Sequence, residues 1–341
     1  MAFYDGLFNA LGLKSWCGEA GGGNTSMADL LAQTSGEETS GPFFPFPSLD
    51  NLSESCGNII KTRDVTKGLE EGFLAAKPAL KTVLDPITQP LSWFLDGALW
   101  LFQATPWFIM IPILVYIAYW ASRSVGVTLF VAISILGLAF IDHYDVAMQT
   151  LSIIFVCTGI SILLGVPIGI AMSKSDRLQK SVVPILDLLQ TLPSFVYLIP
   201  LIFLFSVTES KLYGIAIILY AIVPVIRLTD LGIRLVDRDV IEAADAFGMN
   251  SQQKLWGVQL PLALPNIMAG VNQTIMMSLA MVVIASLVSA PGLGVNVLRG
   301  IRNLELGVGI VAGIGIVLLA VILDRTSKAA LDRVDMARKH N

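Results

Sequence analysis

Beyond residue 104 the sequence consists largely of long apolar segments, and this feature restricts the possible folds more than any other. A helix needs about 20 apolar residues to cross a bilayer, where each backbone polar group must be paired within the segment itself. The segments that approach or reach this length are 105–121, 125–141, 146–172, 192–208, 212–228, 265–290 and 305–324. The sequence therefore predicts an all-α, polytopic membrane protein with about seven transmembrane helices.

Composition supports a membrane protein and excludes several other classes. The chain is 55% hydrophobic and 14% charged, whereas soluble domains are about 25% charged. A net charge of -4 without a strongly basic face argues against nucleic acid as a partner. The sequence shows no nucleophile–base set, metal-ligand cluster or cofactor loop. We therefore expect the lipid bilayer as a partner, no bound metal and no enzymatic activity.

The N-terminal quarter of the chain differs from the rest. Residues 18–58 are rich in Gly, Ser, Thr, Glu and Pro, a composition that buries too little apolar surface to offset its ordering entropy. We expect 1–90 to be a mostly flexible tail. Residues 91–104 should form an amphipathic helix that lies at the membrane interface or packs on the membrane domain. The expected transmembrane domain is 105–324, followed by a tail at 325–341.

The placement of Lys and Arg predicts the orientation, because these residues concentrate in cytoplasmic segments. If the N-terminal tail is outside, the cytoplasmic segments hold 13 Lys and Arg side chains, and the outer loops beyond residue 104 hold three. We therefore expect a multi-pass membrane protein with its N-terminus outside the cytoplasm and its C-terminus inside.

The stretch 229–262 is the longest polar loop of the membrane half, and its pattern predicts two short helices. The first is expected at 240–247, and Gly248 suits the left-handed residue that ends such a helix. The second is expected at 252–257, ending near Leu260 and Pro261. Candidate N-terminal caps are Asp237 or Asp239 for the first helix and Ser251 for the second. A compact helix–turn–helix of this kind suits docking into a groove of a partner protein.

This loop resembles the EAA loop of ATP-binding-cassette importer permeases. The matching spaced residues are Glu242, Ala243, Ala244, Gly248, Val258, Leu260 and Pro261. In that family the loop forms a coupling helix held by a separate ATPase, with small alanines for close approach and the glycine for the turn. The resemblance implies an ATPase-coupling role for Glu242, Ala243, Ala244, Gly248, Leu260 and Pro261.

Further segments resemble the permease of the glycine betaine/proline betaine import system. They are QTLPSFVYLIP (190–200), RLTDLGI (227–233), LPLALPNIMAGVNQT (260–274), MVVIAS (281–286) and VLRGI (297–301). The resemblance covers roughly residues 100–330. It implies a type I importer permease fold, with a core of five helices per subunit and two subunits forming the pathway.

The resemblance also implies partners and a substrate class. The sequence contains no G-x-x-x-x-G-K-[ST] phosphate loop, so we expect no cofactor on this chain and place ATP and Mg on the partner ATPase. The implied partners are two ATPase copies, a second permease copy and a periplasmic substrate-binding protein. The implied location is the bacterial inner membrane, with a periplasmic N-terminus and a cytoplasmic C-terminus. The implied solutes are methylated amines: glycine betaine, proline betaine, choline, carnitine or trimethylamine N-oxide.

Polar residues near or within the apolar segments are candidates for lining the translocation pathway, because such side chains are costly in lipid unless they face a bundle interior or a cavity. The candidates are Gln190, Thr191, Ser194, Tyr197, Asn272, Gln273 and Met276. For Asn272 and Gln273, hydrogen bonding between helices is an equally good alternative. Asp187 precedes the fourth segment and is expected to pair with a basic neighbour.

Cys17 and Cys56 lie in the expected periplasmic tail. In an oxidising compartment they could form a disulfide, or they could remain unpaired.

Two other functional classes remain open at this stage. A secondary transporter driven by an ion gradient would place carboxylates at mid-membrane and show an internal repeat. A non-transporting membrane assembly subunit would not need the EAA-like loop.

Overall fold

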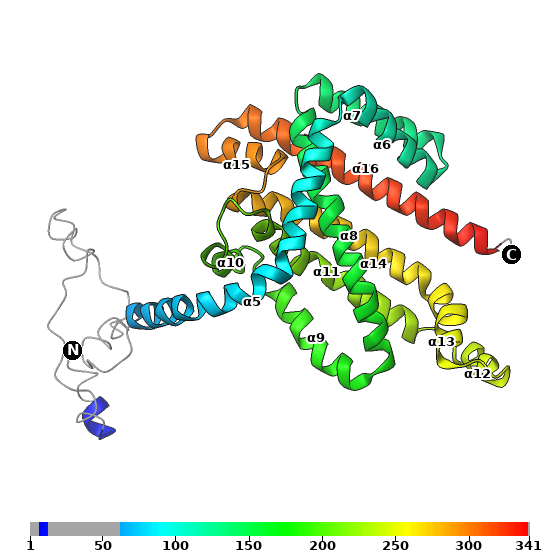
Figure 1. The fold of residues 1–341 in the computed structure, drawn as a ribbon, viewed down its shortest axis with the longest axis horizontal. Coiled ribbons are helices and arrows are strands. Elements are labelled where there is room, and N and C mark those ends of the chain that lie inside the picture. Colours follow the sequence, from blue (N-terminus) through cyan, green and yellow to red (C-terminus); the bar gives the residue numbers. More distant parts are fainter. Residues whose placement is uncertain (1–6, 13–61, 340–341) are drawn as a thin grey trace, which may run out of the picture. The chain divides into compact units, whose positions relative to one another are not determined.

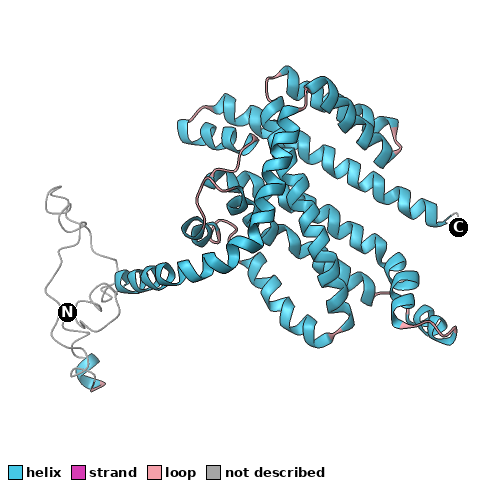
Figure 2. Cartoon of the chain, in the orientation of Figure 1, coloured by secondary structure: helices cyan, strands magenta, loops and turns pink. Residues whose placement is uncertain are grey.

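The computed structural model describes residues 7–12 and 62–339, and helices are the only regular secondary structure in them (Figure 2). This confirms the all-α prediction.

The chain divides into two units, Met1–Ala79 and Leu80–Asn341. The helices from residue 62 onward are α5 Thr62–Ala104, α6 Trp107–Ser122, α7 Val125–Phe140, α8 Tyr144–Lys174, α9 Asp176–Thr191, α10 Leu198–Leu204, α11 Ser210–Arg234, α12 Arg238–Ala246, α13 Ser251–Lys254, η1 Leu255–Gln259, α14 Leu260–Ala285, η2 Ser286–Val288, α15 Leu293–Asn303 and α16 Leu306–Lys339.

Four helical stretches of the described chain are long and apolar enough to cross a membrane. They are Tyr144–Lys174, Ser210–Arg234, Ser251–Val288 and Leu306–Ala330. The pair Val65–Ala104 and Trp107–Ser122, bent by 114°, passes the same test when taken as one broken span. Helix α7 is apolar but has only 16 residues, about 24 Å against a hydrocarbon core of about 30 Å. The described residues thus contain fewer full-length spans than the seven apolar segments that we expected to cross the membrane.

The segment expected as a span at 192–208 is not one continuous helix. Leu192 is extended (ψ 132°) and ends α9, because the ring of the following Pro193 disfavours the helical conformation for the residue before it. Helix α10 then has only seven residues, about 10 Å in length. This expectation is therefore wrong, and the chain here forms an irregular turn followed by a short helix.

Helix α5 has 43 residues and contains the helix expected at 91–104 as its C-terminal part. The boundary drawn at residue 90 does not correspond to a helix end, because residues 62–90 are rich in Leu, Ala, Lys and Glu, which are good helix formers. Cys17 and Cys56 lie outside the described residues.

Helix α11 is the centre of the second unit and packs most extensively on α14 and α8 (Figure 1). Glycines permit the close approach of these helices, as small residues do in membrane bundles. A Cβ atom at Gly169 of α8 would lie 2.7 Å from the Ile226 carbonyl oxygen of α11. A Cβ at Gly270 of α14 would lie 3.1 Å from the Val225 Cα. Backbone contact at these glycines therefore fixes the spacing of the three helices.

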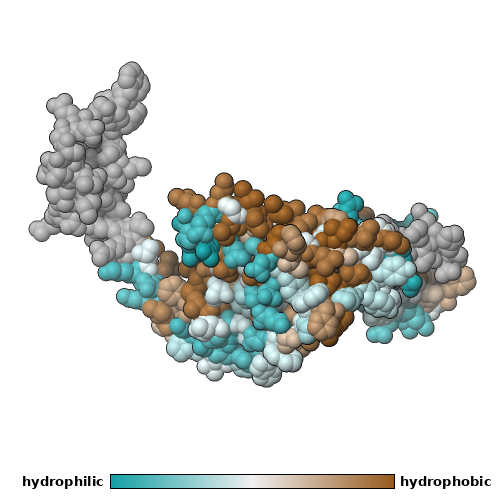
Figure 3. Space-filling view, turned by 90° about the horizontal axis from the view of Figure 1, so that it is seen from above, coloured by the Kyte–Doolittle hydropathy of each residue, from teal (hydrophilic) through white to brown (hydrophobic). Residues whose placement is uncertain are grey.

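Large apolar side chains remain exposed over much of the surface of the second unit. Examples are Phe140, Phe155, Leu163 and Ile314, on α7, α8 and α16. Brown apolar atoms accordingly cover much of the face shown in Figure 3. Such continuous apolar surface is expected where helices face lipid or another apolar partner.

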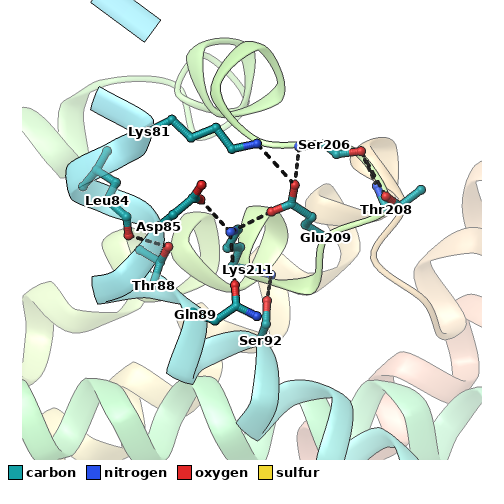
Figure 4. Close-up of polar contacts among 10 residues, drawn as sticks. All are labelled: Lys81, Leu84, Asp85, Thr88, Gln89, Ser92, Ser206, Thr208, Glu209 and Lys211. Atoms are coloured by element: carbon teal, nitrogen blue, oxygen red, sulfur yellow. Dashed lines mark hydrogen bonds and ion pairs between the residues drawn. The ribbon is translucent and has the colours of Figure 1, made fainter. Parts of the chain in front are cut away.

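An ion-pair cluster joins α5 to the beginning of α11 (Figure 4). The Lys211 side chain is almost fully buried, and its Nζ lies 2.7 Å from Asp85 Oδ1 and 2.7 Å from Glu209 Oε2. The same Nζ lies 5.1 Å from the centre of the Phe205 ring. Hydrogen bonds from Lys211 extend along residues 85–92 of α5, so the cluster holds this part of α5 against the connection between α10 and α11. Removing one partner would leave charged groups poorly compensated.

The Glu209 carboxylate gives this cluster a predicted pH dependence. Burial favours its neutral form, but hydrogen bonds from Lys211 and the Ser206 backbone, with the charges of Lys211 and Lys81, hold the pKa of Glu209 below its ordinary value. A carboxyl whose pKa is lowered on folding stabilises the fold above its unfolded pKa, and loses this contribution as the pH falls through the folded pKa. Thermal unfolding should therefore show Glu209→Gln below wild type at pH 7, with the gap closing as the pH is lowered from 7 to below the ordinary pKa of a glutamate. A gap that stays constant over this range would contradict the assignment.

Candidate functional site

Helix α12 forms the first half of the EAA-like loop and has well-defined ends. Asp237 caps its beginning, with Oδ1 accepting a hydrogen bond from the Asp239 N–H at 3.0 Å. At its end, the Met249 N–H donates to the Ala244 carbonyl (3.1 Å), and the Gly248 N–H donates to the Asp245 carbonyl (2.9 Å). These two bonds make a Schellman motif, which needs a left-handed residue after the helix. Gly248 has a φ of +74° and fills that position as predicted.

The second half of the loop differs from the prediction. Asn250 caps α13 instead of Ser251: its Oδ1 accepts from the Gln253 N–H (2.8 Å), and Gln253 Oε1 accepts from the Asn250 N–H (2.9 Å). This reciprocal capping box satisfies two backbone donors, which one serine hydroxyl could not do.

The second helix also does not stop near Pro261. Helix α13 passes through the π-helical turn Leu255–Gln259 directly into α14. In this turn the Leu260 N–H bonds to the Leu255 carbonyl, five residues earlier. A proline inside a helix lacks an N–H and crowds the carbonyl four residues before it. A widened π turn relieves that crowding, so Pro261 is accommodated in the first turn of α14.

The loop is attached to both central helices. Lys254 Nζ lies 2.5 Å from Asp245 Oδ1 and joins α13 to α12. Leu255 is buried in a cluster with Ile233 of α11 and Ala263 and Ile267 of α14, against which Leu260 also packs. The loop thus contacts both α11 and α14, whose ends α12 and α13 join (Figure 1).

The predicted coupling residues occupy distinct places on this loop. Ala244 is buried, Leu260 is half-buried, and Glu242, Ala243, Gly248 and Pro261 are exposed. Glu242 accepts a hydrogen bond from Arg238 at 3.1 Å. Phe247 and Trp256, which the sequence analysis did not single out, are 85% and 69% exposed. Apolar side chains this exposed on a polar loop suit contact with another protein.

The first group of predicted pathway residues lies where α9 is interrupted. Gln190 and Thr191 are exposed in the last turn of α9, and Ser194 is half-buried in the irregular turn. Tyr197 is half-buried, and its Oη is a buried oxygen without a hydrogen-bond partner in the described part of the chain. Because buried polar atoms normally have a partner, this hydroxyl is suited to a water or a solute.

The second group of predicted pathway residues lies on α14, and its members differ in exposure and in hydrogen bonding. The Asn272 Oδ1 accepts from the Ser327 hydroxyl at 2.6 Å, and its Nδ2 donates to Asp324 Oδ1 at 3.3 Å. Both partners belong to α16, so Asn272 bonds between helices, which is the alternative left open by the sequence. Gln273 is exposed and Met276 is half-buried.

Two ion pairs join α9 to α11. Asp187 pairs with Arg227 of α11, which confirms the expected basic partner. Arg234 bonds to Asp176 and Asp230. The sequence gives no sign of this second contact, because Asp176 and Arg234 are 58 residues apart.

An apolar cavity between α5, α8, α14 and α16 contains none of the predicted pathway residues. Its lining includes Phe94, Ile154, Phe155, Leu163, Ile275 and Leu323. A polar solute would find few partners on such a surface, so we do not assign the pathway to it.

The chain thus combines a bundle of apolar helices with a polar loop that packs on α11 and α14 and exposes apolar side chains. The family of binding-protein-dependent transport system inner membrane components matches residues 161–335. The chain belongs to this family, and is thus a multi-pass transport subunit of the inner membrane rather than an enzyme.

Curated relatives support the assignment. The glycine betaine transport system permease protein OpuAB of Bacillus subtilis is 43% identical over 245 residues, covering 72% of this chain and 86% of the relative. The glycine betaine/proline betaine transport system permease protein ProW of Escherichia coli is 41% identical over 266 residues, covering 78% and 73%. The trimethylamine N-oxide transport system permease protein TmoV of Ruegeria pomeroyi is 40% identical over 191 residues, covering 56% and 29%.

A solved structure shares the fold. An inward-facing structure of the MetNI methionine ABC transporter matches with a TM-score of 0.50 at 20% identity, covering 55% of this chain and 94% of the other. The type I importer permease fold implied by the sequence is thereby confirmed.

Proposed function

We propose that this chain is the transmembrane permease subunit of an ATP-driven importer for betaine-like or trimethylammonium solutes. The observation that carries the proposal is the loop formed by α12, α13 and the π-helical turn Leu255–Gln259, which packs on α11 and α14 and exposes Phe247 and Trp256. The names of the relatives, which include glycine betaine, proline betaine and trimethylamine N-oxide permeases, support the solute class.

The proposed complex contains the partners that this family requires. Two copies of a separate ATPase hold ATP and Mg and dock on the loop of each permease copy, and a periplasmic binding protein delivers the solute. The distribution of Lys and Arg supports a periplasmic N-terminus and a cytoplasmic C-terminus. Glu242, Ala243, Ala244, Gly248, Leu260 and Pro261 contribute to the coupling contact.

ATP acts through a difference in affinity between two permease conformations. Closure of the ATPase subunits moves α12 and α13, and the Leu255 cluster transmits the movement to α11 and α14. ATP can favour one conformation only because its bound state fits that conformation better.

The solute passes the interruption between α9 and α10 in this proposal. Gln190, Thr191, Ser194 and Tyr197 offer polar groups there, and the unpartnered Tyr197 hydroxyl supports this placement. Gln273 and Met276 of α14 are further lining candidates, whereas the bonds of Asn272 to α16 favour a structural role. In this proposal the binding protein supplies the main recognition site. Aromatic faces are expected there, because they attract quaternary ammonium groups.

Reconstitution tests the proposed function. The permease is purified with its ATPase, incorporated into proteoliposomes with the binding protein, and assayed against glycine betaine, proline betaine, choline, carnitine and trimethylamine N-oxide. We expect at least one of these solutes to be taken up with ATP and to stimulate ATP hydrolysis. Uptake that persists without ATP and collapses with an ionophore would indicate a secondary transporter. Assembly with the ATPase but no uptake of any solute would indicate a non-transporting subunit.

A further inference from the structure

Arg234 joins three helices at the end of α11 that leads to the coupling loop. Its Nη1 donates to Asp176 Oδ1 in the first turn of α9 (2.7 Å), and its Nη2 donates to the Met172 carbonyl in the last turn of α8 (2.9 Å). Its Nε donates to Asp230 Oδ1 on α11 itself (2.9 Å). The planar guanidinium presents its donors in a fixed fork, which a lysine ammonium cannot reproduce.

A second set of contacts continues this network along α9. The other oxygen of Asp230, which is buried, accepts from Gln179 Nε2 of α9 at 2.6 Å. Near the opposite end of α9, Asp187 pairs with Arg227 of α11. Between these polar contacts, Leu186 is buried in an apolar cluster with Val223 and Ile226. Helix α9 is thus held against α11 by polar contacts toward both of its ends and by apolar packing between them.

The network lies between the two parts of the proposed machinery. Helix α12 begins at Arg238, four residues after Arg234, and the buried Val236 lies in the short link between them. Helix α9 ends at Thr191, where the proposed pathway residues begin. The route from the coupling loop to the interruption at Pro193 therefore leads along α11, through Arg234 and its partners, and along α9.

We propose that Arg234 is a positioning residue that makes α9 follow the movement of the coupling loop, with Asp176 as its partner on α9. The inference rests on the proposed function, because it concerns how that movement reaches the pathway. Asp176 is 75% exposed, and ion pairs at the surface contribute little to stability. Stability alone therefore explains little of this contact.

The test measures solute transported per ATP hydrolysed in proteoliposomes that contain the complete transporter. Asp176→Asn and Arg234→Gln should lower this ratio at least about fivefold, the lower end of typical coupling effects. Arg234→Lys keeps the charge but not the fork and should give an intermediate value. Arg177→Gln is the matched control, because this exposed neighbour has no ion pair in the described chain, and its ratio should remain at the wild-type value.

Each outcome separates the inference from the proposed function. If uptake and hydrolysis fall in equal proportion in Asp176→Asn and Arg234→Gln, or the ratio is unchanged, Arg234 has only a structural role and the inference is wrong. Asp176→Asn keeps the result interpretable if Arg234→Gln does not fold, since Asp176 lies at the surface. Absence of ATP-dependent uptake in wild type would reject the proposed function and, with it, this inference.

Discussion

Replacing Gly248 by valine should lower ATP-driven uptake about tenfold or more, because a β-branched residue at a left-handed position costs at least about 1–2 kcal/mol. The cause is conformational and not steric, since a Cβ at Gly248 would have no atom within 4 Å, while its φ is +74°. Valine would open the Schellman turn and change the angle between α12 and α13. The measurement is initial uptake in proteoliposomes at equal amounts of assembled complex.

Gly248→Asn is the matched control for this substitution. Asparagine adopts left-handed conformations far more readily than valine, and space is available for its side chain. It should therefore retain most of the uptake. Equal loss in both variants would show that the side chain itself blocks docking, and equal activity would show that the turn does not control coupling.

The largest effect on stability is expected at Gly169, on α8. A Cβ there would lie 2.6 Å from Thr229 Cβ and 2.7 Å from the Ile226 carbonyl oxygen, both on α11. Overpacking typically costs about 1–3 kcal/mol, and the upper part of that range is expected because a backbone atom cannot turn aside. Gly169→Ala should therefore clearly lower the unfolding temperature of the purified protein in detergent.

Gly159→Ala provides the comparison on the same helix. A Cβ at Gly159 would have no atom within 4 Å, and alanine favours a helix over glycine by up to about 1 kcal/mol. This variant should unfold at the wild-type temperature or slightly above it. If both alanine variants unfolded at the same temperature, close contact between α8 and α11 would not be an important source of stability.

The sequence predicts those features that depend on local chemistry. The apolar lengths of α8, α11, α14 and α16 identify them as spans, and the pattern around Asp237 and Gly248 locates the first loop helix to within two residues. The apolar run at 192–208 predicts a span, because apolar residues alone do not show that Pro193 ends α9 and that only seven helical residues follow in α10. The alternative caps Asn250 and Ser251 are adjacent, so only the reciprocal bond with Gln253 distinguishes them.

The remaining features depend on contacts between distant segments. Lys211 reads as an ordinary charge at the beginning of a span, and its burial against Asp85 depends on α5 passing beside it. Asn272 has the same polarity whether it faces a pathway or Ser327, and only the packing of α14 on α16 distinguishes the two. The role inferred for Arg234 likewise requires the relative placement of α8, α9 and α11.

The central claim is that a partner ATPase moves this subunit through the loop of α12 and α13. Phe247, 85% exposed at the end of α12, can be replaced by a photo-crosslinking phenylalanine analogue in the assembled transporter. Illumination should join this position to the ATPase subunit, and cross-linking should stop further uptake. A cross-link to the periplasmic binding protein, or unchanged uptake after complete cross-linking to the ATPase, would contradict the account.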